Sequence, residues 1–208
     1  MGKLNNTKEA QLEQNLIDLL CAQHGQWTFR SDLKTEEDLW NNLRNIIEIR
    51  NKSELNDNML TDSEFERIRS EILANTKTPF EAAKWLRGEK GKCSVVLERD
   101  NGLGRIELII YSSIEKNGGF SSYEIVHQIA KNKSNLEERS RRFDITLLIG
   151  GLPIIQIELK TAIAKDGVKQ AYYQIEKYID EGTFSNTIFQ TLQLYVMSNE
   201  QTTRYMAA

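Results

Sequence analysis

Two acidic residues and a lysine stand out in the stretch RRFDITLLIGGLPIIQIELK, residues 141–160. Asp144 lies in one apolar segment, and Glu158 and Lys160 end the next one, after a Gly-Gly pair. Two adjacent carboxylates repel each other and take up protons unless a cation lies between them. Such oxygen ligands suit Mg²⁺, which activates bound water and neutralises charge on a phosphodiester, and a nearby lysine can orient that water. These residue types therefore favour metal-dependent phosphodiester hydrolysis.

Strand geometry decides whether these three groups can meet, because side chains alternate between the two faces of a strand. Glu158 and Lys160 share one face of the second segment, and the other face is apolar. A two-residue Gly-Gly turn alone would pair Asp144 with Ile157. The sequence therefore predicts a three-residue loop or one β-bulge, which would pair Asp144 with Glu158 instead. An ordinary salt-bridged trio on an exposed sheet face is the alternative interpretation.

The elements that must position these residues follow from apolar periodicity and turn residues. Helical patterns dominate the first part of the chain, a polar segment at 50–62 suggests a mobile connection, and strands follow. This order favours a mixed α/β layer with a central sheet. The expected helices are 7–24 (with a stripe of Leu12, Leu16, Leu19 and Leu20), 35–49, 63–74, 79–87 and 165–181; the expected strands are a hairpin within 93–114, 143–149, 154–160 and 191–199, and 122–130 could be a short helix or a strand.

Composition limits the classes of protein that remain. The chain has 208 residues, a net charge of −3 and two cysteines, Cys21 and Cys93. This length suits one domain, and the widely separated cysteines are expected to fill core positions in a reducing, cytoplasmic setting. The sequence has no secretory signal and no apolar run long enough to span a bilayer, so no membrane partner is expected. The net charge argues against DNA binding by electrostatics alone.

The pattern FD, fourteen residues before ELK, resembles the PD-(D/E)xK nuclease motif, with Phe143 in place of the leading proline. With QAYYQIEKYI following, it is similar to the N-terminal nuclease domain of the restriction (R) subunit of type I restriction-modification enzymes. The similarity is densest over residues 139–182. It implies a restriction-endonuclease-like α/β core, in which a central mixed β-sheet is flanked by helices, with an N-terminal helical portion.

The resemblance also implies roles for individual residues. Asp144 and Glu158 would bind Mg²⁺ together with the backbone carbonyl of Leu159, and Lys160 would be the catalytic lysine. Nucleases of this fold often add a glutamate from the first helix, for which Glu13 is the candidate and Glu9 the second choice. Residues expected to orient the site or contact DNA are Gln174 and Tyr178, which share one helix face, and then Gln170, Arg141 and Arg142.

The function implied is that of a Mg²⁺-dependent endodeoxyribonuclease domain acting on double-stranded DNA. Residues 1–208 would form a single domain, helical over about 1–90 and with the catalytic sheet and helix over about 92–200. The chain contains no G-x-x-x-x-G-K-[ST] phosphate loop. It would therefore be a piece of a larger subunit that uses ATP elsewhere and assembles with modification and specificity subunits. The alternatives are a non-catalytic DNA-binding or subunit-docking domain, and a repair nuclease of the same superfamily.

Overall fold

The computed structural model describes residues 2–22, 26–112, 122–130, 142–162 and 166–208, including all side chains except those of 2–7, 130 and 142. A six-stranded sheet forms the centre of this described part, and it is mixed because β1 runs parallel to β4 and β6 parallel to β7 while the other neighbours are antiparallel. Its strands are, in spatial order, β1 (Thr28–Phe29), β4 (Tyr123–Ala130), β5 (Arg142–Ile149), β6 (Leu152–Leu159), β7 (Leu194–Ser198) and β8 (Thr203–Ala207).

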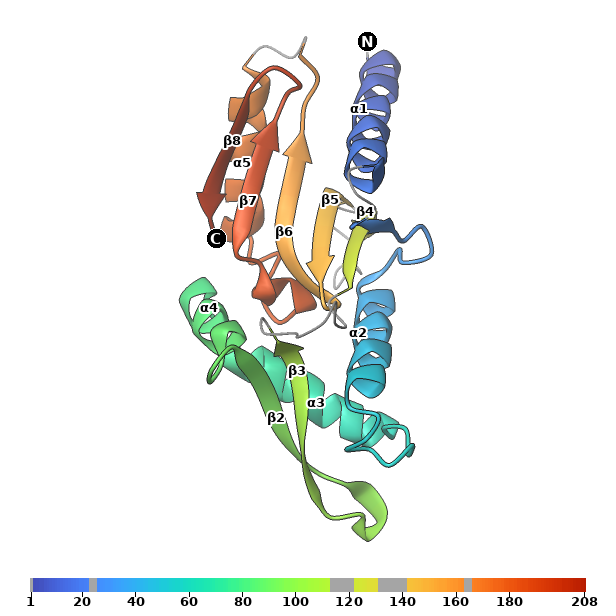
Figure 1. The fold of residues 1–208 in the computed structure, drawn as a ribbon. Helices are drawn as coiled ribbons and strands as arrows, with labels where there is room; N and C mark the ends of the chain where they lie inside the picture. Colours follow the sequence, from blue (N-terminus) through green and yellow to red (C-terminus); the bar gives the residue numbers. More distant parts are fainter. Residues whose placement is uncertain (1, 23–25, 113–121, 131–141, 163–165) are drawn as a thin grey trace.

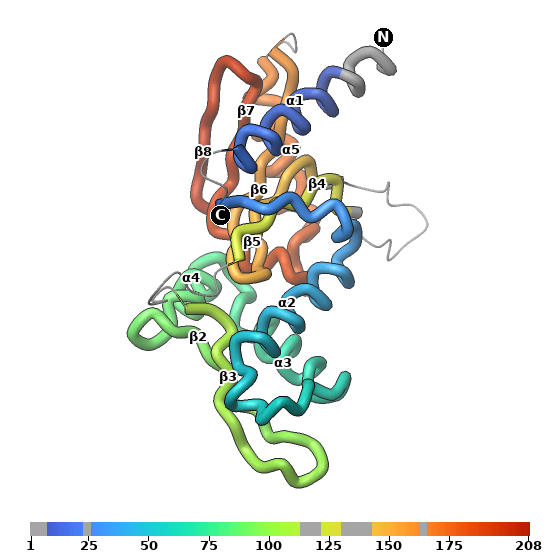
Figure 2. The backbone as a smooth tube through the Cα atoms, turned by 45° about the vertical axis from the view of Figure 1, so that its right-hand side comes forward, coloured from blue at the N-terminus to red at the C-terminus, as the bar shows by residue number. Residues whose placement is uncertain are grey.

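Two helices cover the two faces of this sheet (Figures 1 and 2). Helix α1 (Gly2–Ala22) buries Ile17 against apolar residues of β4, β5 and β6. Helix α5 (Gly167–Asp180) buries Ala171 and Ile175 in a separate cluster, which includes side chains of β5 and β7. The sheet is therefore the middle layer of a three-layer arrangement, as expected for a restriction-endonuclease-like α/β fold.

The remaining elements pack at one end of the sheet, where a two-stranded hairpin projects away from it (Figure 1). Each of the three helices here begins with a capping box, in which a threonine side chain and an acidic side chain satisfy each other's backbone N–H groups. The elements are α2 (Glu36–Arg50), α3 (Asp62–Asn75), α4 (Pro79–Arg87), β2 (Lys92–Glu98) and β3 (Arg105–Ser112), with short 3₁₀ turns η1 (Asp100–Gly102) and η2 (Ile188–Thr191).

A single apolar cluster connects this end of the molecule with the sheet. Trp40 and Leu43 of α2, Ile68 of α3 and Leu108 of β3 belong to the same buried cluster as Leu148 of β5. Buried apolar surface is the main favourable term in folding. The helical end and the α5 face of the sheet therefore share one core, whereas α1 packs in the separate cluster on the other face. No helix among the described residues is long and apolar enough to cross a membrane.

The predicted helices and strands are confirmed within a few residues, and three details of the prediction are wrong. The segment 50–62 is not a loose connection, because Leu55 and Leu60 are buried and the Leu60 N–H donates to Glu48 Oε1 at 3.0 Å. In α1, Leu12, Leu16 and Leu20 of the expected stripe pack partly buried against the sheet, but Leu19 is 53% exposed and the most deeply buried residue is Ile17. The hairpin β2–β3 forms its own sheet instead of joining the central one.

One strand and the two cysteines agree with the expectations from the sequence, and two further strands were not expected. The segment 122–130, for which the sequence allows a short helix or a strand, contains strand β4. Cys93 is buried and Cys21 is half-buried against the α1 cluster, as expected for core-filling thiols. Strands β1 and β8 were not predicted, since two residues of β1 and the polar flank of β8 carry little periodic signal.

The Gly-Gly turn between β5 and β6 gives a first testable prediction. Both glycines have positive φ, and a Cβ on Gly151 would lie 2.9 Å from Ile46 Cδ1 and 3.2 Å from Leu43 Cα. Gly151→Ala therefore combines left-handed strain with overpacking against α2. We expect it to lower the free energy of unfolding by about 2–4 kcal/mol, measured by urea denaturation.

Gly104→Ala is the matched control, because Gly104 has almost the same φ, +84° against +83°, and a Cβ placed there would have no atom within 4 Å apart from its chain neighbours. It isolates the backbone strain, roughly 1–2 kcal/mol. Equal losses for the two variants would show that the turn does not press against α2.

Candidate active site

The turn and a β-bulge together bring Asp144 opposite Glu158. Ile149 pairs with Leu152 across the two-residue turn, and the register then shifts between Leu147 and Leu148. Beyond the shift Ile145 pairs with Ile157, and continuing this register by one residue places Asp144 opposite Glu158. The predicted irregularity is therefore confirmed, and it takes the form of a bulge.

Glu158 is fully buried beneath α5. Its exposed fraction is 0%, so the interpretation of an exposed ionic trio on the sheet surface does not hold. Gln174 Nε2 donates to Glu158 Oε2 at 2.8 Å, and Gln156 Nε2 lies 3.3 Å from Oε1. Thr146 Oγ1 in turn donates to Gln156 Oε1 at 2.7 Å. Two amide groups thus hold the Glu158 carboxylate in one orientation.

Asp144 reaches across to the neighbouring strand. Its Oδ2 accepts a hydrogen bond from the Leu159 N–H at 2.8 Å, which fixes the carboxyl group beside the end of β6. The predicted metal ligand at this residue, the Leu159 carbonyl, stays a prediction. Lys160 is half-buried, and its backbone N–H donates to Ser198 O of β7 at 2.9 Å. The three predicted catalytic residues therefore lie at the same end of β5 and β6.

The surroundings of Asp144 and Glu158 disfavour the charged forms of both carboxyl groups. Burial raises the pKa of Glu158 well above its usual value, and the charge of Asp144 raises it further, whereas Lys160 opposes the shift. Burial also raises the pKa of Asp144, against the Leu159 hydrogen bond and the charge of Lys160. Neighbouring buried carboxyl groups cannot both ionise cheaply without a cation between them. The donor set is thus suited to a divalent ion.

Helix α1 brings Glu13 next to this pair. Glu13 is buried, and Gln128 Nε2 of β4 donates to both its oxygens at 2.9 Å. Burial raises the pKa of Glu13 to about 7; the Gln128 hydrogen bonds oppose this shift, and the charge of Asp144 adds to it. Even so, no group of three or more His, Cys, Asp or Glu side chains in the described residues is gathered closely enough to hold a metal ion. Glu13 therefore lies near the carboxylate pair, but the three acidic side chains are not close enough together to form a metal-binding cluster.

The predicted pair on α5 contacts Glu158 through Gln174. Gln174 Nε2 also lies 2.6 Å from the Tyr178 hydroxyl, and Tyr178 is only 4% exposed, with its ring edge-on to Phe143. This burial favours an orienting role over contact with DNA. Gln170, one turn earlier, is exposed. Arg141 lies outside the described residues, as does the side chain of Arg142.

Sequence reasoning missed three polar residues that support the site. Gln156 and Thr146 could have been found, because their strand parity places them on the face of Glu158. Gln128 could not, since it lies 115 residues from Glu13 and has the positive φ of an irregular strand position. Only the packing of α1 on the sheet brings these two residues together.

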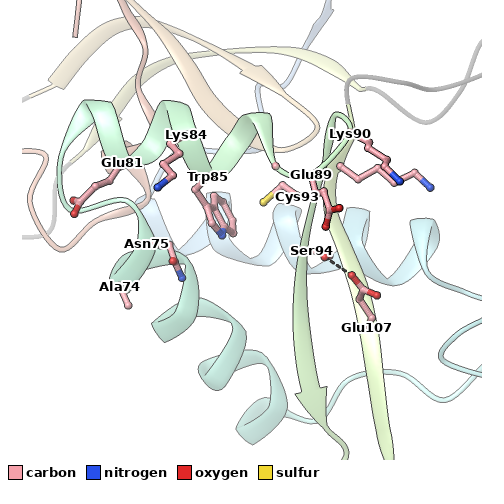
Figure 3. Close-up of a pocket in the computed structure, with 12 residues that line it drawn as sticks. Ala74, Asn75, Glu81, Lys84, Trp85, Glu89, Lys90, Cys93, Ser94 and Glu107 are labelled. Atoms are coloured by element: carbon pink, nitrogen blue, oxygen red, sulfur yellow. Dashed lines mark hydrogen bonds between the residues drawn. The ribbon is translucent and has the colours of Figure 1, made fainter.

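A cavity of about 710 Å³ lies elsewhere, between α3, α4 and the hairpin (Figure 3). It is at the end of the molecule away from the C-terminal end of β6, and Trp85 forms part of its wall. Its positively and negatively charged side chains are equal in number, so the cavity shows no preference for an anion or a cation. We therefore place the candidate chemistry at the Asp144–Glu158 pair. The charged residues are Lys84, Lys90, Lys92, Glu81, Glu89 and Glu107.

The described fold, a mixed six-stranded sheet between helices, is consistent with the restriction-endonuclease-like class of α/β proteins. A family model described as the N terminus of the type I restriction enzyme R protein matches residues 6–208. The chain therefore belongs to this family, as the resemblance of its motif indicated.

Similar proteins carry related names. The type I restriction enzyme SsaAORF53P endonuclease subunit of Staphylococcus saprophyticus is 30% identical over 177 residues, which cover 84% of this chain and 17% of that subunit. The SauCOLORF180P endonuclease subunit of Staphylococcus aureus is 29% identical over 180 residues, 86% of this chain and 17% of the subunit. The EcoprrI endonuclease subunit of Escherichia coli is 42% identical over 83 residues, 38% of this chain and 25% of the subunit. The chain thus spans a small part of the length of these relatives.

Proposed function

We propose that this chain is the Mg²⁺-dependent endonuclease domain of a type I restriction enzyme R subunit and hydrolyses phosphodiester bonds of double-stranded DNA. One observation carries the proposal: Asp144 meets the buried Glu158 across two paired strands, and Lys160 follows two residues later. Membership of the R-subunit family supports the assignment.

Asp144 and Glu158 would hold the ion, with the Leu159 carbonyl and water completing the oxygen ligands that Mg²⁺ prefers. When bound, the ion supplies an activated water and neutralises charge on the phosphate. Lys160 orients the attacking water and contacts the phosphate. Glu13 would approach as a further acidic group, and Gln170, Arg141 and Arg142 remain candidates for DNA contact.

The proposed function extends to the larger protein. Since the chain covers 17% of its staphylococcal relatives, we propose that the complete cytoplasmic subunit also carries the ATP-dependent DNA translocase and assembles with modification and specificity subunits. In that setting the partners select the DNA sequence, and this domain cuts.

A non-catalytic docking domain is the second candidate function, and metal binding separates it from a nuclease. We expect Mn²⁺ or Mg²⁺, at a concentration about 100 times its dissociation constant, to stabilise the chain by about 2.7 kcal/mol, or roughly 5–10 °C in Tm. Asp144→Asn is expected to abolish this shift. Its amide oxygen can still accept the Leu159 N–H, and its NH₂ group can donate to Glu158, so the metal-free variant is expected to melt no lower than the parent.

Asp57→Asn is the control for this experiment, because the Asp57 side chain is 76% exposed and pairs only with Lys52 at 3.3 Å among the described residues. It should keep the full metal-induced shift. A parent chain that shows no shift with either ion, or an Asp144→Asn variant that keeps it, would support the docking domain.

Gln174 gives a further prediction, because it is the closest donor to the candidate ligand Glu158. Gln174→Ala is expected to weaken Mn²⁺ binding about 10–100-fold by isothermal titration calorimetry, since outer partners of metal ligands contribute that much. Tyr178→Phe should have a smaller effect, because the Tyr178 hydroxyl accepts a hydrogen bond from Gln174 and acts on Glu158 through that residue. Gln11→Ala, on the exposed side of α1, is the control. Unchanged affinity in Gln174→Ala would mean that Glu158 is not the ligand.

A further inference from the structure

A second cavity, of about 600 Å³, opens beside the candidate site. Its walls come from the residues after β6, the first turn of α5, the end of β7 and the start of β8. Figure 1 shows these segments together at one end of the sheet, opposite the projecting hairpin. The polar and charged residues of its lining include Lys169, Arg204, Asn199, Thr202 and Asp166.

This cavity adjoins the candidate catalytic lysine. The Lys160 N–H donates to Ser198 O at 2.9 Å, and Asn199, the residue that follows β7, lines the cavity. Ala162, two residues after Lys160, lines it as well. A DNA strand whose reacting phosphate lies at Lys160 would therefore carry a neighbouring phosphate past the cavity mouth.

The charged groups in the cavity wall favour an anion. Lys169 and Arg204 are both exposed, and within the described part of the chain neither forms an ion pair with an acid; the Lys169 ammonium lies 5.6 Å from the centre of the Tyr173 ring. Asp166, exposed at the start of α5, is the acid among the lining residues. The helix start itself adds positive potential. The cavity of Figure 3 differs, because its lysines and glutamates are equal in number.

We propose that this cavity binds a backbone phosphate of double-stranded DNA next to the phosphate that is cut, with Lys169 and Arg204 as the charged contacts. The inference rests on the proposed nuclease function. Arginine matches phosphate oxygens with two parallel N–H groups, and Asn199 and Thr202 add hydrogen-bond donors. Phosphate contacts position a protein on the duplex without reading its sequence. This local positive contact would hold DNA at the site although the whole chain carries a net charge of −3.

The test measures binding of the 208-residue chain to a short fluorescein-labelled duplex by fluorescence anisotropy, at low salt and with Ca²⁺ present. Lys169→Ala/Arg204→Ala is expected to bind about tenfold more weakly or worse. The slope of log K against log salt should become shallower by about 1.8, which corresponds to two lost phosphate contacts. Lys169→Arg/Arg204→Lys keeps both charges and should retain most of the affinity.

Lys177→Ala/Arg87→Ala is the matched control, because it also removes one lysine and one arginine from exposed positions, on α5 and α4. Thermal unfolding of each variant confirms that it is folded. Equal weakening in the two double variants, unchanged binding in Lys169→Ala/Arg204→Ala, or no DNA binding by the parent chain would each overturn the inference. The proposed nuclease function fails separately, if Mg²⁺-dependent cleavage survives replacement of Glu158.

Discussion

Glu158→Ala is expected to reduce DNA cleavage by the complete R subunit more than about 100-fold while ATP hydrolysis is kept. Even partners of metal ligands contribute about 10–100-fold to activity, so loss of a ligand should exceed that range. Glu158 is fully buried and receives Gln174 at 2.8 Å, which shows that the packing of α5 holds this carboxylate in place. The measurement compares duplex cleavage with DNA-stimulated ATP hydrolysis in the assembled enzyme.

The isosteric variant Glu158→Gln guards against a trivial loss of folding, because alanine would leave a cavity at a buried position. It should lose cleavage to a similar extent. Glu37→Gln is the control, since the Glu37 side chain is 56% exposed and forms an ion pair with Arg69 of α3 at 3.3 Å. If ATP hydrolysis fell together with cleavage in Glu158→Gln, the residue would have a structural role and the proposal would be wrong.

Lys160→Ala is expected to lower cleavage by about 10²–10⁴-fold and to leave metal binding in place. The ammonium group is close enough to affect the pKa values of Asp144, Glu158 and Glu13, but it is not an oxygen ligand. Removing it should therefore lower the rate of cleavage more than the affinity for the metal ion. The two readouts are the cleavage rate under single-turnover conditions and the Mn²⁺-induced rise in Tm.

Lys52→Ala, at a side chain that is 73% exposed, should leave both readouts of this experiment unchanged. A Lys160→Ala variant that cleaves at the parental rate would remove lysine from the mechanism. One that loses the metal-induced shift as well would show that Lys160 acts by shaping the carboxylate site.

The order of helices and strands could be predicted because the signals are local. Apolar periodicity and turn residues such as the Gly-Gly pair act over a few residues, and they correctly indicated α2 to α5 and the pair β5–β6. The interpretation of 50–62 failed for the opposite reason. Leu55 and Leu60 are buried in one apolar cluster with residues of distant segments, such as Leu108 of β3, and a polar composition does not reveal such partners.

The amino-acid sequence by itself determined which groups could do the chemistry, Asp144, Glu158 and Lys160, and that their strands needed one irregularity to meet. Strand parity is a property of the backbone, so it can be read without coordinates. Tertiary structure decided that the irregularity is a bulge at Leu147 and Leu148. It also decided that α5 buries Glu158 and that Gln128 holds Glu13, because contacts between distant segments depend on how whole elements pack.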